Sequence, residues 1–101
     1  MWVSAGFDPH RSDPIGGMKM SERGFAALCS AINEFAERVC KGRLVLLLEG
    51  GYSLSGLARS VHACVEILTG RRETFPAGVG PQAAVALRAA LETHRPYVKG
   101  L

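Results

Sequence analysis

The feature that most constrains the fold is a continuous apolar run at residues 44–48 (LVLLL), which shows no alternation of apolar and polar residues. Such a run is typical of a strand buried on both faces, as in a parallel sheet covered by helices. A second short apolar run occupies residues 2–7 and ends at Asp-Pro, so it is also predicted to be a buried strand.

Three further segments are predicted to be helices, at residues 21–42, 53–70 and 81–94. The first begins at a serine suited to an N-cap and ends at a glycine suited to the C′ position. The second has Ser53 or Ser55 as its N-cap, and the third has proline in its first turn. Apolar residues recur at steps of three and four in the first helix: Phe25, Leu28, Cys29, Ile32, Phe35, Ala36 and Val39.

The order strand, helix, strand, helix, helix contains one β-α-β crossover, which indicates an α/β fold with a parallel sheet in a three-layer α-β-α arrangement. The 101 residues suffice for one domain. However, two strands bury little area and leave both sheet edges open. We therefore expect residues 1–101 to form the C-terminal part of a larger α/β domain, with a compact domain of two strands and three helices as the alternative.

Composition excludes several classes of function. Hydrophobic residues make up 48% of the chain and charged residues 21%, as in an ordinary globular protein. The net charge is +3, but the basic residues are scattered and Arg71-Arg72 is the only adjacent pair, so we expect no nucleic-acid partner. The longest apolar run is too short to cross a bilayer, and no signal peptide is expected.

The three cysteines are Cys29, Cys40 and Cys64, with no C-x-x-C spacing. This odd number predicts neither a disulfide framework nor a zinc knuckle. Cys29 and Cys64 fall on apolar helix faces, where cysteine acts as a small core residue. These features are consistent with a reducing, cytoplasmic location.

Candidate functional residues follow both predicted strands. The first loop carries Asp8, His10 and Asp13, and the second, residues 49–52, ends in Tyr52. Ligands of open parallel sheets bind beyond the carboxyl ends of the strands, and a β-α-β crossover places both loops at the same end. The sequence therefore predicts that a carboxylate and a phenol share one crevice.

Two motifs in this order, VSAGFDPHRSDPIGG and LVLLLEGGYSL, resemble the C-terminal third of the zinc-dependent histone deacetylase family. That family includes bacterial acetylpolyamine amidohydrolases and shares the arginase–deacetylase fold. The resemblance extends from Val3 to the HRPY tail at residues 94–97. Glu49 before Gly-Gly-Tyr is more similar to the class II-like and bacterial branches than to class I.

The resemblance implies roles for particular residues. Asp8 matches the aspartate that is a zinc ligand, and Tyr52 matches the tyrosine that polarises the acyl carbonyl and stabilises the oxyanion. Gly50 and Gly51 match glycines that line the acyl-lysine channel. Asp13 matches a second aspartate that we expect to shape the turn. A carboxylate suits zinc, and a neutral tyrosine hydroxyl is a hydrogen-bond donor.

The family's other two zinc ligands and its paired catalytic histidines lie in earlier motifs that this sequence lacks. The histidines here are His10, His62 and His94, and none matches those motifs. We expect His62 near the apolar face of a helix, and Pro9 replaces a small residue of the family. The chain alone thus supplies one zinc ligand of three and no general base.

Each of these residues also has a simpler interpretation. Asp8 could bond to its own turn, and His10 could be solvent-exposed or turn-bonding, with metal binding as a weaker alternative. Tyr52 could be a rim aromatic, and Gly50 and Gly51 a turn that allows positive φ.

The sequence therefore predicts a C-terminal fragment of a zinc-dependent amidohydrolase that hydrolyses acetyl-lysine or acetylated polyamines when complete and is inactive alone. A non-catalytic interaction module that self-associates or pairs with a complementing chain is one alternative. A small phosphate-binding domain that uses the loop between Gly50 and Gly56 is another.

Overall fold

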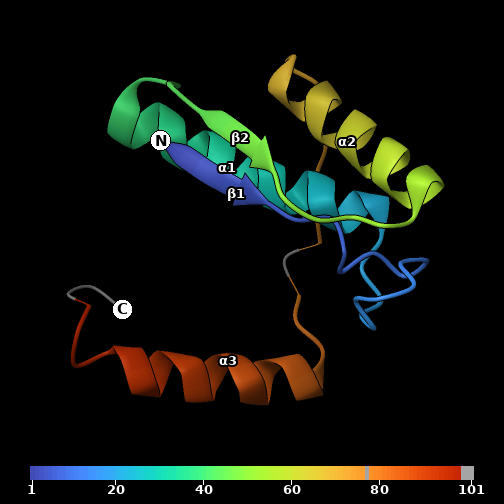
Figure 1. Ribbon diagram of the computed structural model, residues 1–101. Coiled ribbons are helices and arrows are strands. Elements are labelled where there is room, and N and C mark those ends of the chain that lie inside the picture. The colour runs from blue at the N-terminus through green and yellow to red at the C-terminus, as the bar shows by residue number, and fades with distance from the viewer. Residues whose placement is uncertain (77, 99–101) are drawn as a thin grey trace.

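The computed structural model describes residues 1–76 and 78–98. Five elements follow one another in the predicted order (Figure 1). Both strands are shorter than their apolar runs, and the helix ends agree with the sequence to within a residue or two. The elements are β1 (Trp2–Ala5), α1 (Glu22–Cys40), β2 (Val45–Leu48), α2 (Leu54–Leu68) and α3 (Pro81–His94).

The two strands pair in parallel, with Trp2 opposite Val45 and Ala5 opposite Leu48. Backbone bonds continue past the strand ends, because Glu49 N donates to Ala5 O at 3.1 Å and Phe7 N donates to Gly50 O at 2.8 Å. The predicted β-α-β crossover is confirmed, and the α/β class with it.

Helix α1 begins and ends where its capping residues predict. The Ser21 hydroxyl accepts a hydrogen bond from Gly24 N at 3.2 Å, which satisfies one of the free amides of the first turn. At the other end, Lys41 and Gly42 take left-handed backbone conformations, with φ of 55° and 70°. The Gly42 amide donates to Ala36 O, so the sequence placed this helix end correctly.

Helix α2 is capped by Ser53, whose hydroxyl accepts from Gly56 N at 3.3 Å, and not by Ser55. Its buried side consists of Gly56, Ser60, Cys64 and Ile67. This side therefore includes two small residues, Gly56 and Ser60, as well as apolar ones. Val65, by contrast, is 48% exposed.

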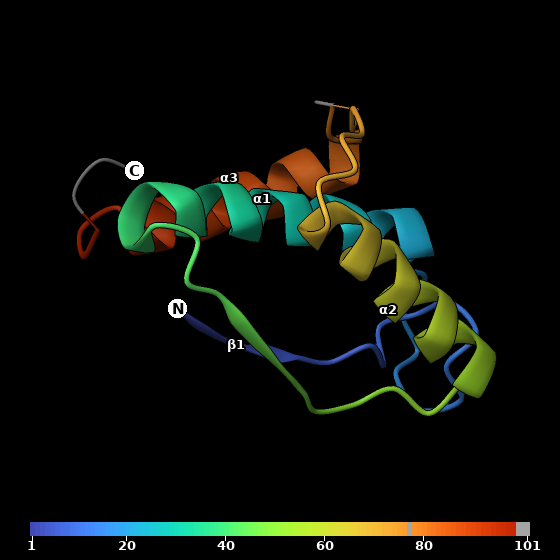
Figure 2. The same ribbon diagram turned by 90° about the horizontal axis from the view of Figure 1, so that it is seen from above.

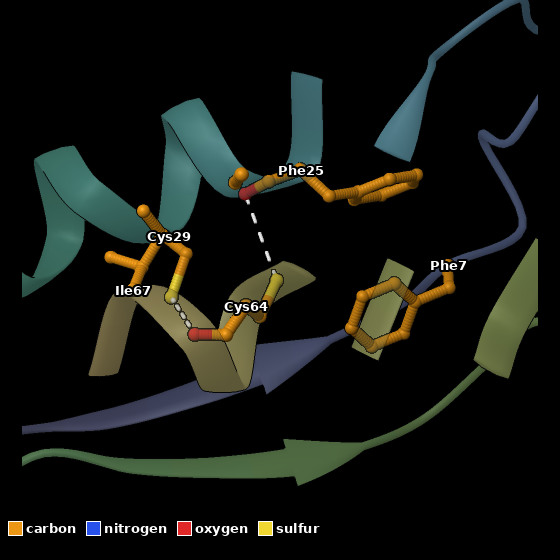
Figure 3. Packing of buried hydrophobic residues seen from close by; sticks show 6 residues of the cluster. Phe7, Phe25, Cys29, Cys64 and Ile67 are labelled. Atoms are coloured by element: carbon orange, nitrogen blue, oxygen red, sulfur yellow. Dashed lines mark hydrogen bonds between the residues drawn. The ribbon is translucent and has the colours of Figure 1, made fainter. Parts of the chain in front are cut away.

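The core lies between α1, α2 and the residues that follow β1 (Figure 3). Phe7 and Phe25 rings are 5.0 Å apart, and Ala26, Cys29, Cys64 and Ile67 complete the cluster. Both helices lie on one side of the strands, as Figure 2 shows from above. This side of the sheet carries Val3, Ala5 and Leu46 at half-buried positions.

The opposite face of the sheet is uncovered, so the prediction that residues 44–48 are buried on both faces is wrong. Trp2 is 74% exposed, Val45 43% and Leu47 48%. Among the described residues, no helix packs on this face. A parallel sheet ordinarily has both faces covered, so this surface is an unusual one for a complete domain.

Helix α3 packs against none of the other four elements within the described part of the chain. Figure 1 shows it apart from the α1–α2 pair. Its apolar residues Val85 and Leu87 are largely exposed, and none of its residues is buried. Among the described residues, the structure has no helix with the length and apolar character needed to span a bilayer.

Candidate functional site

The loops that follow β1 and β2 lie against each other at the carboxyl end of the sheet, as the parallel crossover predicts. The Tyr52 amide donates to Oδ2 of Asp13 at 2.7 Å, which joins the second loop to the first. Together with the bond from Phe7 N to Gly50 O, this contact fixes the relative position of the loops. Candidate residues from separate parts of the sequence are thereby brought to one place.

The carboxylate of Asp8 lies in a space that two glycines leave open. A Cβ atom on Gly50 would lie 2.7 Å from Asp8 Oδ1, and one on Gly6 would lie 2.8 Å from the same oxygen. Both distances are below any ordinary contact, so larger residues would displace the carboxylate. Glycine at position 50 lets the backbone of the second loop approach the Asp8 carboxylate closely. The backbone of Gly50 does not adopt a positive φ, so the predicted turn conformation is not the reason for glycine here.

Gly51 has a different role from Gly50. Its φ of 135° lies in the region that side-chain-bearing residues rarely adopt, and a Cβ there would lie 3.0 Å from Phe7 Cβ. The chain turns at this position, and Tyr52 follows with its side chain 59% exposed. An accessible phenol at the rim of the two loops suits a group that bonds to an incoming molecule.

Asp13 builds its own turn and also holds the second loop. Its Oδ1 accepts from the amides of Ile15 and Gly16 at 2.9 and 3.0 Å, and its Oδ2 accepts from Tyr52. Desolvation works to raise the pKa of Asp13, but the backbone N–H groups of Tyr52, Ile15 and Gly16 outweigh it and lower the pKa below 3.8. The expectation that Asp13 shapes the turn is confirmed.

His10 is buried, with 1% of its surface exposed, so the interpretation of a solvent-exposed histidine is wrong. The turn-bonding interpretation is correct: Nδ1 accepts from Ser12 N at 3.1 Å and lies 2.7 Å from Ser12 Oγ. Since Nδ1 accepts, the ring proton is on Nε2, which lies 3.3 Å from Glu22 Oε1. That contact is long and poorly aligned, and the ring also stacks on Phe25.

Glu22, in the first turn of α1, is the centre of an ion-pair cluster. Arg59 Nε lies 2.7 Å from its Oε1, and an Arg11 nitrogen lies 3.1 Å from its Oε2. The bond from Arg59, with smaller contributions from His10 and Arg11, lowers the pKa of Glu22 to about 2. No local sequence signal pairs these residues, because Arg59 comes from α2, 37 positions away.

The start of α2 packs against His10 and is already occupied by protein groups. A Cβ on Gly56 would lie 2.6 Å from His10 Nδ1, so glycine is needed for this approach. Ser53 accepts from the Gly56 amide, and the Asp13 carboxylate accepts from the Tyr52 amide. A phosphate at this loop would meet a carboxylate, so the arrangement does not favour phosphate binding.

The residues present do not by themselves fit a zinc ion. Asp8, His10 and Asp13 do not converge, because His10 faces Ser12 and Glu22 while Asp13 bonds to loop amides. Residues 1–76 and 78–98 contain no group of three or more His, Cys, Asp or Glu side chains placed to hold a metal. His62, expected near an apolar face, is instead 74% exposed beside Glu66.

The fold and the paired loops define the class of protein. The structure resembles the histone deacetylase Clr3, with a TM-score of 0.80 at 24% sequence identity over 97% of this chain and 16% of that one. It also resembles the HDA15 HD domain, with a TM-score of 0.75 at 25% identity over 95% of this chain and 25% of that one. The fold is that of histone deacetylase domains.

The sequence comparison identifies the family. Residues 1–68 match the histone deacetylase domain, and the chain belongs to the histone deacetylase family. It is 37% identical to histone deacetylase 18 of Arabidopsis thaliana over 93% of this chain, and 46% identical to a probable deacetylase of Archaeoglobus fulgidus over 54% of it. The resemblance of the two motifs to the histone deacetylase family is confirmed.

The chain spans only a small part of these relatives, 14% of the Arabidopsis protein and 15% of the archaeal one. Its relation to the class II-like or bacterial branch and its place in the C-terminal part of the domain stay predictions.

Proposed function

We propose that this chain forms one wall of the active site of a zinc-dependent amidohydrolase, from the C-terminal portion of the catalytic domain. The complete protein would hydrolyse the acetyl-amide of acetyl-lysine or of an acetylated polyamine. The observation that carries the proposal is the placement of Asp8 against Gly50, at the carboxyl ends of adjacent parallel strands, in a member of the histone deacetylase family.

Asp8 is the residue of this chain suited to a metal ligand. Its carboxylate lies in the gap between Gly6 and Gly50, and no hydrogen bond to its oxygens occurs among the described residues. In the complete domain, zinc would be held by Asp8 and by two ligands outside this chain, and it would supply Lewis acidity.

Tyr52 is suited to donate a hydrogen bond to the acyl oxygen of the substrate. Its backbone is held by Asp13, while its side chain is mostly exposed at the junction of the loops. A donor that is held in place before the reaction stabilises the oxyanion without reorganisation, and loss of one such donor typically lowers the rate by ~10²–10³. Gly50 and Gly51 keep this junction open to a substrate chain.

A chimera tests the proposal. Residues 1–68 replace the matched segment of Arabidopsis histone deacetylase 18, whose own activity on an acetyl-lysine peptide is measured first. We expect the folded chimera to be active, and Tyr52→Phe in it to lower kcat by roughly 10²–10³ with little change in KM or zinc content. Asp8→Ala should lose bound zinc as well as activity.

An unchanged kcat for Tyr52→Phe in a folded, zinc-loaded chimera would exclude the proposed role of the tyrosine. Retention of zinc by Asp8→Ala would exclude the proposed role of the aspartate. These two results are independent, because one concerns catalysis and the other metal content.

We also propose that the 101-residue chain is inactive by itself, because Asp8 is its one candidate ligand. The measurement is an acetyl-lysine peptide assay with the pure chain and added zinc. Zinc-dependent product formation would contradict this statement.

Reading the DNA upstream of Met1 tests the C-terminal placement, since we expect an open frame that encodes an Asp-x-His motif and paired histidines.

A second candidate function is an interaction module without catalysis, and the uncovered sheet favours it. Trp2, Val45 and Leu47 form an exposed apolar face, and both sheet edges are open. Under this alternative the chain forms a stable oligomer, or pairs with a complementing chain, without zinc. The chimera separates the two, because an interaction module would give an inactive, folded product.

A further inference from the structure

Two cysteine thiols lie close together in the core, where the proposed function gives them no role. Cys29 comes from α1 and Cys64 from α2, and both are free thiols in the structure. They are 3% and 6% exposed. Figure 3 shows each sulfur directed at a backbone oxygen of the facing helix, Cys29 Sγ at Cys64 O and Cys64 Sγ at Phe25 O.

The contacts of the two thiols are reciprocal across the helix interface. Cys29 Sγ donates to Cys64 O at 3.7 Å, and Cys64 Sγ donates to Phe25 O, one turn before Cys29, at 3.7 Å. Each sulfur therefore lies against the backbone of the opposite helix. Because each sulfur contacts the backbone of the other helix, Cys29 and Cys64 are neighbours across the α1–α2 interface, which a disulfide between them requires.

The third cysteine is placed differently. Cys40 lies at the end of α1, where its sulfur contacts Ala36 O and Arg43 O at 3.2 and 3.4 Å. It is half-buried, so a reagent in solution reaches it more easily than the two core thiols. Cys40 is therefore an internal control for unspecific thiol chemistry.

We propose that Cys29 and Cys64 form a reversible disulfide, by exchange with a small-molecule disulfide, that cross-links α1 to α2. The Cys29 thiolate attacks one sulfur of the reagent, forms a mixed disulfide and releases the first reagent thiolate. The Cys64 thiolate then attacks Cys29 Sγ, forms the Cys29–Cys64 bond and releases the second reagent thiolate. Two cysteine thiols are oxidised, one reagent disulfide is reduced to two thiols, and the two cysteine protons go to the released thiolates or to solvent.

The electrostatics of the pair favour this order of attack. The neighbouring Cys64 thiol lowers the pKa of Cys29 against the opposing effect of burial, whereas the Cys29 thiol and burial both raise the pKa of Cys64. Since both sulfurs are buried, the reagent reaches them through local opening of α1 from α2, and the reaction is expected to be slower than capping of Cys40.

Peptide mapping of the native chain tests the proposal without any substitution. The chain is equilibrated with oxidised glutathione under native conditions, quenched in acid, alkylated in denaturant and digested with trypsin without reduction. Trypsin places each cysteine in its own peptide: residues 24–38, 39–41 and 60–71. We expect peptide 24–38 joined to 60–71 as the main cross-linked species, and peptide 39–41 capped by glutathione.

Recovery of peptides 24–38 and 60–71 only as alkylated or glutathione-capped species would overturn the proposal. So would a yield of the 24–38/60–71 pair no greater under native conditions than in denaturant. A further expected result is a higher denaturation midpoint for the oxidised chain than for the reduced one, because the cross-link joins positions 35 apart in the sequence. Cys40→Ser should keep that difference, and Cys64→Ala should abolish it.

Discussion

At the scale of single residues, Asp8, His10 and Asp13 are close together in the sequence but have different roles in the first loop. Asp8 faces the glycines of both loops, Asp13 bonds to amides, and His10 is buried against Phe25. Only Asp8 keeps its charged group free of protein donors among the described residues. Asp13 and His10 therefore stabilise the loop, and Asp8 is the one candidate ligand of the three.

Replacing Asp13 with asparagine tests the link between the loops. Asn has one acceptor oxygen, so it cannot serve both the turn amides and the Tyr52 amide as the carboxylate does. The folded pKa of Asp13 is lowered, so its bonds are intact above the ordinary pKa and are lost as pH falls through the folded value. We expect the Tyr52 amide resonance to titrate with a midpoint below pH 3.8 in the native chain.

In Asp13→Asn the Tyr52 amide should show no such titration and should exchange with solvent faster. A Tyr52 amide that titrates equally in both chains would show that Asp13 does not hold the second loop. Asp8 is the neighbouring carboxylate, so Asp8→Asn is the matched control and should leave the titration in place.

Glu22 makes the stability of the fold dependent on pH. Its folded pKa of about 2 lies below its ordinary value of 4.5, so its contribution is complete above pH 4.5 and is lost as pH falls toward 2. We expect acidification over this range to lower the free energy of unfolding of the native chain by about 1–2 kcal/mol more than that of the Glu22→Gln variant. The figure is below the full shift because Arg11 and Arg59 are half-exposed.

Urea denaturation midpoints of both chains at several pH values between these limits provide the measurement. Equal acid sensitivity would show that the ion pairs of Glu22 do not stabilise the fold. Glu34→Gln is a control on the same helix, and it should leave the acid sensitivity unchanged.

At the scale of elements, the first turns of α1 and α2 are a matched pair. In each helix a serine N-cap accepts from a glycine amide three residues later, at Gly24 in α1 and Gly56 in α2. Their surroundings differ: a Cβ on Gly24 would meet the flexible Met20 side chain at 3.1 Å, whereas one on Gly56 would meet the buried His10 ring at 2.6 Å.

Alanine at these two positions should therefore have opposite effects. Gly24→Ala should be neutral or raise the free energy of unfolding by up to about 1 kcal/mol, as alanine favours helix. Gly56→Ala should lower it by about 1–3 kcal/mol, because His10 and the first loop must move. Denaturant unfolding of the two variants measures the difference, and equal effects would show that the His10–Gly56 contact is unimportant.

At the scale of the whole molecule, the exposed apolar surface dominates what the isolated chain does. The sheet is covered by α1 and α2 on one face only, and α3 does not pack on the other (Figures 1 and 2). A surface of this kind associates with whatever apolar partner is available. We expect the isolated chain to self-associate through it unless the rest of a deacetylase domain covers it.

Adjacent residues of β2 separate this association from folding. Leu47 lies on the uncovered face, and Leu46 faces the helices. Leu47→Lys should reduce self-association in sedimentation velocity while changing the free energy of unfolding by no more than about 0.5 kcal/mol. Leu46→Lys should destabilise the chain by about 2 kcal/mol or more, because it places a charge against the core. Unchanged association of Leu47→Lys would contradict the proposed surface.

The elements, their order and their parallel pairing could all be predicted from the sequence, because these depend on local signals. Hydrophobic periodicity, the serine caps and the glycines at 42 and 70 fix the helices, and a crossover of parallel strands must bring both site loops to one edge. Asp8, Gly50 and Tyr52 could be chosen as candidates for the same reason. The uncovered sheet face could not be foreseen, because an apolar run does not say how many layers surround it.

Which groups meet across long separations in the chain became known from the folded structure. It buried His10 against Phe25, paired Glu22 with Arg59, joined Asp13 to the Tyr52 amide and placed Cys29 beside Cys64. None of these contacts has a local sequence pattern, because each depends on how α2 packs against α1 and the first loop. The sequence showed three cysteines without a pairing pattern, and the packing of two helices selected the pair.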